Sequence, residues 1–252
     1  MKKRLIASIM TVAMAASLLA GCGVPKSESG GESGGSDASG EKVFRFSTRT
    51  EPTTLDPSKG NCIPDTELQN AITERLVRNV KGEVKEGIAE KWEISDDGLV
   101  YTFHLRDAKW SDGEPITAEQ FVYSWRRLMD PETAAPFAYI GEYIKNGRAV
   151  EVGEMEPEEL GVKAIDEKTL EVTLEHPTAY FLSMMGLSSL FAPIREDIVE
   201  KYGKDFAADA EKNVYSGPYV LTSSANQKWI FEPNENYWDK DNIFISSITY
   251  NY

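Results

Sequence analysis

The stretch from Lys109 to Arg126 has the sequence KWSDGEPITAEQFVYSWR and carries the densest structural signal in the chain. Its Ser111-Asp112-Gly113 segment favours a turn, because Asp hydrogen-bonds nearby backbone and Gly adopts φ angles that other residues avoid. Thr117-Ala-Glu-Gln120 has the pattern of a capping box, which satisfies free backbone donors at the start of a helix. These signals predict a turn and then a helix that continues through Phe121–Leu128 and stops before Asp130-Pro131.

Alternating apolar residues on both sides of this stretch predict strands. Apolar side chains alternate over Leu99–Leu105 and again over Leu170–Leu174, as expected for strands with one buried face. Further strands are predicted at Val43–Ser47, Val220–Leu221, Trp229–Phe231 and Ile243–Tyr250. Further helices are predicted from a capping box at Thr66–Gln69 to Asn79, at Pro177–Met185 and at Glu196–Tyr202. Helices and strands interleave without a strict βαβ order, which predicts a mixed α/β protein.

The composition is that of a globular protein with a substantial core. The chain has 252 residues, of which 41% are hydrophobic and 27% are charged. Its formal net charge of −14 argues against a nucleic-acid partner, because phosphate binding needs clustered Lys and Arg. Trp92 and Trp110 are interpreted as core anchors, and the acidic run Glu154–Glu159 as a solvated face.

The first residues have the features of an export signal. Lys2, Lys3 and Arg4 precede the apolar stretch Leu5–Ala20, which is shorter than the ~20 residues of a spanning helix. The following Leu19-Ala20-Gly21-Cys22 resembles the bacterial lipobox, whose Cys becomes the lipidated N-terminus. We therefore expect a signal peptide at 1–21 and a lipid anchor on Cys22. The alternative is an ordinary signal peptide with an incidental Cys.

Residues 22–40 are rich in Gly and Ser and predict a flexible tether between this anchor and a folded body. The protein would then be exported and held at the outer face of the cell membrane, or in the periplasmic space of a host with an outer membrane. Lipidation of Cys22 leaves Cys62 without a disulfide partner in the chain. No zinc-type spacing of Cys and His occurs, so we expect no metal and no cofactor, and assign neither to His104 or His176.

From Glu51 onward the sequence resembles family 5 of the bacterial extracellular solute-binding proteins (the peptide/nickel family), and within it the oligopeptide-binding proteins. The segments that carry this resemblance are Glu51–Pro57, Ile88–Trp92, Ser95–Gly98, Tyr101–Arg106, Lys109–Gly113, Thr117–Arg126, Glu159–Asp166, Leu170–Leu174, Ser216–Tyr219 and Asn234–Asp239. They keep their order and spacing along about 200 residues. Asp130–Pro136 and the Glu159–Ala164 segment favour the oligopeptide branch.

The resemblance implies a periplasmic-binding-protein-like fold (type II, cluster C), with two lobes around a ligand cleft. In this chain the first lobe would comprise residues 41–72 and 196–252, with a β-rich subdomain inserted at 73–195. Family members are considerably longer, so we expect the second lobe to be missing. The sequence ends in Ile248-Thr-Tyr-Asn-Tyr252, within an apolar, strand-like stretch, from which we also expect an incomplete fold.

The resemblance also implies a function, which is to capture oligopeptides and deliver them to an ABC import permease with its ATPases, as a monomer. By that resemblance Asn61, Cys62, Ile63 and Pro64 would lie beside the ligand, with the Ile63 main chain pairing with peptide. Without the resemblance, the residues Asn61–Pro64 predict only a surface loop. Phe137 would line the cleft where oligopeptide carriers usually have Tyr, so a ligand hydrogen bond from that hydroxyl is absent here.

Three alternatives remain open from the sequence. The protein could carry another solute, such as a nickel chelate or an oligosaccharide, or be a truncated copy that binds nothing. An enzyme is disfavoured, because the chain lacks Gly-x-Ser-x-Gly, His-Glu-x-x-His and any His-rich site. A catalytic role for Cys62 is also disfavoured, because only Lys59 lies close enough in sequence to activate its thiol.

Overall fold

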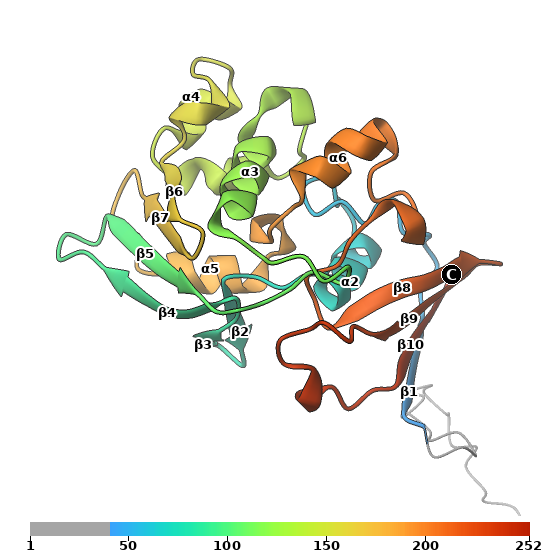
Figure 1. Cartoon of the computed structure of the whole chain (residues 1–252). Coiled ribbons are helices and arrows are strands. Elements are labelled where there is room, and N and C mark those ends of the chain that lie inside the picture. The colour runs from blue at the N-terminus through green and yellow to red at the C-terminus, as the bar shows by residue number, and fades with distance from the viewer. Residues whose placement is uncertain (1–40) are drawn as a thin grey trace, which may run out of the picture. The chain divides into compact units, whose positions relative to one another are not determined.

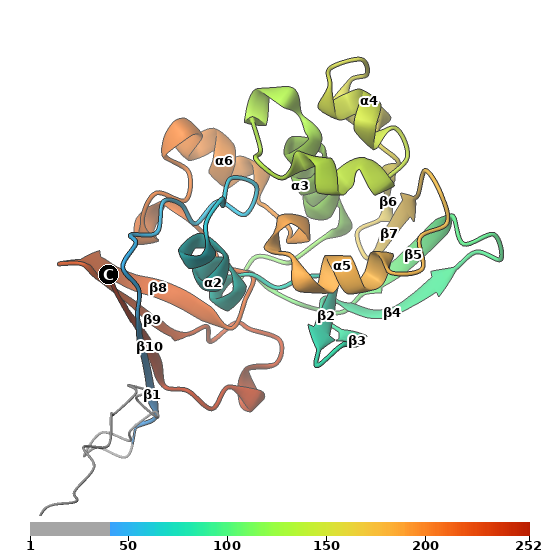
Figure 2. The same cartoon turned by 180° about the vertical axis from the view of Figure 1, so that it is seen from behind.

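The computed structural model describes residues 41–252, which form two four-stranded sheets and a small hairpin (Figures 1 and 2). The predicted signal peptide (1–21), the tether (22–40) and the lipidated Cys22 lie outside the described residues. None of the described helices is both long enough and apolar enough to cross a membrane.

The first sheet joins the two ends of the described chain. Its strands, in spatial order, are β1 (Val43–Ser47), β10 (Ser247–Asn251), β9 (Lys228–Pro233) and β8 (Tyr219–Ala225). β1 pairs in parallel with β10, and the other neighbours are antiparallel. Helix α2 (Ile63–Ile72) packs against β8 and contributes Leu68 and Ile72 to the core under this sheet.

The second sheet comes from the middle of the chain and is antiparallel throughout. Its strands, in spatial order, are β4 (Ala89–Ile94), β5 (Val100–Leu105), β7 (Thr169–Thr173) and β6 (Val162–Asp166). Helix α3 (Ala118–Met129) packs on the β6 and β7 side of this sheet (Figure 1). Phe103 of β5 and Leu170 of β7 are paired across the sheet and fully buried, as their alternation predicts.

Short elements complete the described chain. The hairpin consists of β2 (Val77–Val80) and β3 (Glu83–Glu86). The remaining α-helices are α4 (Gly147–Glu151), α5 (Phe181–Leu187) and α6 (Glu196–Tyr202). The 3-10 helices are η1 (Pro131–Thr133), η2 (Ala138–Tyr143), η3 (Pro157–Glu159), η4 (Ser189–Phe191), η5 (Gly203–Asp205), η6 (Ala210–Lys212) and η7 (Lys240–Asn242).

The quoted stretch 109–126 folds as predicted. Gly113 has a φ of +93° in the turn, and the Asp112 side chain accepts a hydrogen bond from the Glu114 N–H at 3.2 Å. In the capping box, Gln120 Oε1 accepts the Thr117 N–H at 3.0 Å. The same Gln120 oxygen accepts the indole N–H of buried Trp110 at 2.9 Å, which joins the turn to the helix.

Both ends of the helix predicted from Thr66 to Asn79 are wrong. The helix begins at Ile63 rather than at a capping box on Thr66, because the extended Cys62 is its N-cap and Pro64 fits its first turn. The helix also ends at Ile72 instead of continuing to Asn79. Val77–Val80 forms strand β2, because Lys81 and Gly82, both with positive φ, turn the chain back to pair with β3.

Two other predicted elements are shifted. The helix expected over Pro177–Met185 is α5 and begins at Phe181. The strand expected over Ile243–Tyr250 is confined to β10, because the preceding residues form η7 and an irregular segment before the pairing with β1 begins.

Two buried clusters of apolar side chains stabilise the described chain. One draws on residues between Leu76 and Phe191 and contains Trp110, with Trp92 packed against it, so both tryptophans have the predicted packing role. The other draws on residues from Leu55 to Ile72 and from Ile194 to Tyr250. The acidic residues at 154, 156, 158 and 159 are exposed, as predicted. The division into a first lobe (41–72 and 196–252) and an insertion (73–195) stays a prediction.

Candidate functional site

Residues 53–62, here called the anchored loop, lead from β1 into α2, where buried Asp65 is their main anchor. The Asp65 carboxylate accepts hydrogen bonds from Thr53 N (2.6 Å), Thr53 Oγ1 (2.8 Å), Thr54 N (3.2 Å) and Asn61 N (3.2 Å). Burial alone would raise the pKa of this carboxyl, but the hydrogen bonds outweigh burial, so the pKa of Asp65 is lowered. One carboxylate therefore ties both ends of the anchored loop to the first turn of α2.

Gln69, one turn further along α2, fastens the middle of the anchored loop. Its Nε2 donates to the carbonyl of Asp56 at 2.9 Å, and its Oε1 accepts from Ser189 Oγ at 3.0 Å. Gly60 lies so close that a Cβ there would be 2.5 Å from Gln69 Nε2. The loop thus packs directly on the helix, and only glycine fits at position 60 without a shift of Gln69.

Asp56 fastens the same loop to a second helix. Its Oδ1 accepts the Ser58 N–H at 3.0 Å, which forms an Asx turn. Both carboxylate oxygens also pair with the guanidinium of Arg127 on α3, at 3.0 Å from Nη1 and 2.7 Å from Nη2. Only 4% of the Asp56 side chain and 12% of the Arg127 side chain are exposed, so this is a nearly buried, bidentate ion pair.

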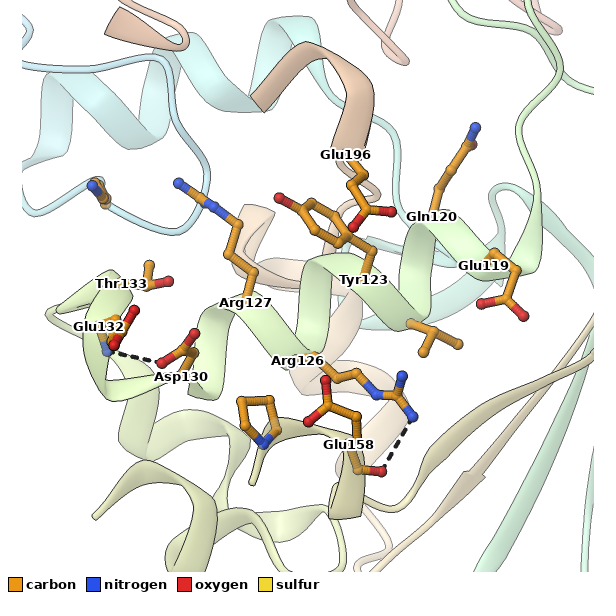
Figure 3. Close-up of a pocket in the computed structure, with 13 residues that line it drawn as sticks. Glu119, Gln120, Tyr123, Arg126, Arg127, Asp130, Glu132, Thr133, Glu158 and Glu196 are labelled. Carbon is orange, nitrogen blue, oxygen red and sulfur yellow. Dashed lines mark hydrogen bonds between the residues drawn. The ribbon is translucent and has the colours of Figure 1, made fainter. Parts of the chain in front are cut away.

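A surface cleft of about 550 Å³ lies over the outer face of α3 (Figure 3). Lys59 of the anchored loop, Tyr123 and Arg127 of α3 and Glu196 of α6 line it. Figure 3 shows Arg127 projecting from α3 toward the loop, while Arg126 on the other side donates to the Glu158 carbonyl at 3.2 Å. The cleft therefore borders the anchored loop, although Asn61–Pro64 and Phe137 are not among its lining residues.

Residues 83–252 match bacterial extracellular solute-binding proteins, family 5 (middle). The chain belongs to this family. It is 38% identical to the periplasmic oligopeptide-binding protein OppA of Salmonella typhimurium, over 99% of this chain and 45% of that protein. It is 39% identical to the probable deoxycholate-binding periplasmic protein YgiS of Escherichia coli, over 83% of this chain and 40% of that protein.

Solved structures of family members resemble the described fold closely. Listeria monocytogenes OppA bound to peptide has a TM-score of 0.81 at 38% identity, covering 84% of this chain and 42% of that structure. Haemophilus influenzae OppA in complex with RPPGFSPFR has a TM-score of 0.79 at 35% identity, over the same shares. This family 5 chain therefore spans less than half the length of these relatives.

Family membership confirms two predictions. The fold is the mixed α/β, periplasmic-binding-protein-like fold, present here in part. Family 5 proteins bind solutes and are not enzymes, which agrees with the lack of catalytic motifs. Within residues 41–252, no three His, Cys, Asp or Glu side chains converge on a metal-sized site. His104 Nε2 lies 3.6 Å from the exposed Glu93 carboxylate on the neighbouring strand.

The structure places the four predicted cleft-edge residues at the junction of the anchored loop and α2. Asn61 is exposed, while its N–H is held by Asp65. Cys62 has extended backbone angles (φ −137°, ψ 164°), so this position suits strand-like pairing. Ile63 is the first residue of α2 and is 74% exposed, whereas Pro64 is buried. Only the first part of the segment is therefore extended.

The Ile63 N–H makes no hydrogen bond among the described residues. The first amide groups of a helix have no partner within the helix, so such a group is free to donate elsewhere. The Cys62 thiol is not suited to catalysis, because burial and the neighbouring Asp65 carboxylate raise its pKa. A thiol kept protonated is a poor nucleophile, which fits the sequence-based view that Cys62 is not catalytic.

Phe137 lies in a different part of the structure, just before η2. Its ring is partly buried against the cluster around α3, and its centroid is 6.2 Å from that of the exposed Tyr139. Among residues 41–252, no hydrogen bond, ion pair or ring contact joins Phe137 to Asn61–Pro64. The structure thus leaves the two predicted halves of the site on separate cores, and their role in binding stays a prediction.

Sequence reasoning missed the polar residues that fix the anchored loop. The ion pair of Asp56 with Arg127 spans 71 positions, so no local pattern points to it. Asp65 was not singled out, because its donors precede it by up to 12 positions and leave no periodic pattern. Asp56 before Pro57 has the chemistry of a turn, which was the one local signal in this segment, and nothing local marks Asp65.

Proposed function

We propose that this protein captures oligopeptides outside the cytoplasm and delivers them to an ABC import permease. The observation that carries the proposal is its similarity to oligopeptide-binding proteins: two named OppA match 98% or more of this chain, and a peptide-bound OppA shares its fold. Because the chain spans less than half of these relatives, the whole protein's ligand and partners are part of the proposal.

The anchored loop supplies groups suited to an extended peptide. The unpaired Ile63 N–H would donate to a peptide carbonyl without regard to sequence, while the exposed Ile63 side chain would cover the ligand. Phe137 would supply an apolar wall on the opposite side. Its ring has no hydroxyl, so it would hold side chains by packing alone.

Calorimetry of the full-length protein tests this proposal. We expect saturable binding of the nonapeptide RPPGFSPFR or of trialanine, and no binding of deoxycholate. Replacement of Ile63 by Pro should weaken peptide binding about tenfold, because it removes one hydrogen-bond donor. Proline is well tolerated at this first helical position, so the fold should be retained. Ile63→Ala, which keeps the N–H, is the matched control and should bind more tightly than Ile63→Pro.

A non-peptide solute is the second candidate, because one relative of comparable identity is a probable deoxycholate-binding protein. Deoxycholate is an amphipathic acid that would use the apolar surfaces of Ile63 and Phe137 rather than main-chain pairing. Binding of deoxycholate without binding of either peptide would favour this candidate. Titration with a nickel chelate and with an oligosaccharide tests the remaining solutes, and no binding of any of these probes would point to a non-binding copy.

We also propose that Cys22 anchors the exported protein to the outer face of the cell membrane. Two or more acyl chains hold a protein far more firmly than one, at about 0.8 kcal/mol per buried CH₂. Expression with radiolabelled palmitate should label the wild-type protein and not Cys22→Ala. Labelling of the variant, or equal release of both proteins from membranes by salt, would contradict the anchor.

A further inference from the structure

The Asp56–Arg127 ion pair connects the two halves of the candidate site. Asp56 belongs to the anchored loop, whose end carries Asn61–Ile63. Arg127 belongs to α3, whose C-terminal end leads through η1 to Phe137. Among the described residues, this ion pair is therefore a direct side-chain link between the anchored loop and α3, the helix that leads to Phe137.

The other anchors of the loop do not reach α3. Asp65 and Gln69 both stand on α2, so they fix the loop relative to its own helix. Gln69 also accepts a hydrogen bond from Ser189 of η4, which packs on α3, but that bond holds α2 and not the loop itself. Arg127 alone among these anchors comes from α3, and Figure 3 shows its side chain extended from that helix toward the loop.

The chemistry of the pair suits an orienting role. A guanidinium that contacts both oxygens of a carboxylate fixes direction as well as distance, which a lysine ammonium cannot do. Asp56 Oδ1 also accepts the Ser58 N–H, and the Arg127 guanidinium lies 5.5 Å over the Phe206 ring. Neither partner can therefore turn away without losing a second contact.

We propose that Arg127 is a positioning residue that sets the placement of Asn61–Ile63 relative to Phe137, and thereby the affinity for an extended ligand. It does not touch the ligand in this proposal. The binding part of the inference rests on the proposed peptide function, whereas the positioning part does not.

Arg127→Lys in the full-length protein tests the proposal, because it keeps the charge and removes the two-point geometry. In the ligand-free protein, we expect the amide hydrogens of residues 56–62 to exchange about tenfold faster. Calorimetry with RPPGFSPFR should show binding about tenfold weaker than that of the wild type.

Ile88→Ala is the matched control. Ile88 is fully buried and adjoins β4, at the edge of the second sheet away from β6 and β7, so its truncation destabilises the fold without touching the pair. It should leave both loop exchange and peptide affinity within about twofold of wild type in the folded protein. A purely structural role for Arg127 would make Arg127→Lys behave like this control, and that result would overturn the proposal.

The two arms separate failure of the inference from failure of the proposed function. If the wild type binds neither RPPGFSPFR nor trialanine, the peptide function fails. The exchange measurement still tests the inference: faster loop exchange in Arg127→Lys supports positioning by Arg127, and unchanged exchange refutes it. If the wild type binds peptide and Arg127→Lys binds equally well, the inference fails while the peptide function stands.

Discussion

The second sheet and the anchored loop are stabilised by different interactions. The sheet β4-β5-β7-β6 packs apolar side chains such as Phe103 and Leu170 under α3. The anchored loop (53–62) buries only the small apolar surfaces of Leu55 and Pro57 and is otherwise fixed by the buried polar groups of Asp56, Asp65 and Gln69. Apolar burial stabilises an element whatever its exact contacts, whereas polar anchors stabilise one conformation of one segment.

The largest expected effect is on the apolar core under the second sheet. Phe103→Ala removes a fully buried ring from β5 and should lower the free energy of unfolding by about 4 kcal/mol. Urea denaturation measures it. Ile165→Ala, on the half-exposed surface of β6, is the control and should change the same quantity by about 0.5 kcal/mol or less. Equal losses in the two variants would mean that β5 does not form the core.

The next largest effect is on the polar anchors of the loop. Asp65→Ala leaves the N–H groups of Thr53, Thr54 and Asn61 without their acceptor and should cost about 3 kcal/mol in urea denaturation. Glu67→Ala removes an exposed acid from the same helix and serves as the control. Amide exchange in Asp65→Ala should rise in residues 53–62 and not in β5. Uniform acceleration would show that the anchor is not local.

A smaller effect is expected from the close packing of the loop against α2. Gly60→Ala places a Cβ 2.5 Å from Gln69 Nε2 and should cost about 2 kcal/mol, because the amide must move off its partners. In a Gln69→Ala background the same substitution should cost much less. Thermal unfolding of the four proteins in this double-mutant cycle measures the coupling, and additive losses would exclude the contact.

The smallest effect is a pH dependence. The pKa of Asp65 is lowered in the folded state, so its stabilisation is present above the unfolded pKa of about 3.9 and is lost as pH falls through the folded pKa. The difference in unfolding free energy between wild type and Asp65→Asn should therefore shrink between neutral pH and about pH 3. A difference that grows on acidification would contradict the assigned hydrogen bonds.

Much of the fold was predictable because it depends on local patterns. The alternation in β5 and β7 and the capping box of α3 act over a few residues, and all three elements formed where predicted. The errors near α2 have a local cause as well. Thr66 lies three residues inside a helix whose start is set by Pro64 and the extended Cys62, and Leu68, Ile72 and Leu76 have the four-residue spacing of a longer helix.

The candidate site was predictable only in part. The resemblance to family 5 pointed to Asn61–Pro64 and Phe137, and the structure shows where they lie without testing their role. The groups that hold the first segment in place were not predictable. The Asp56–Arg127 pair and the Ser189–Gln69 hydrogen bond join residues 71 and 120 positions apart.

The sequence by itself determined the family, the mixed α/β class and the elements whose apolar period repeats within a few residues. Only the tertiary structure decided how the anchored loop is fastened, because its hydrogen-bond partners come from α2, α3 and the Ala207 carbonyl. Apolar periodicity reports which face of an element is buried. It carries no information on which distant donor will meet a buried carboxylate, since that depends on how the helices are placed against one another.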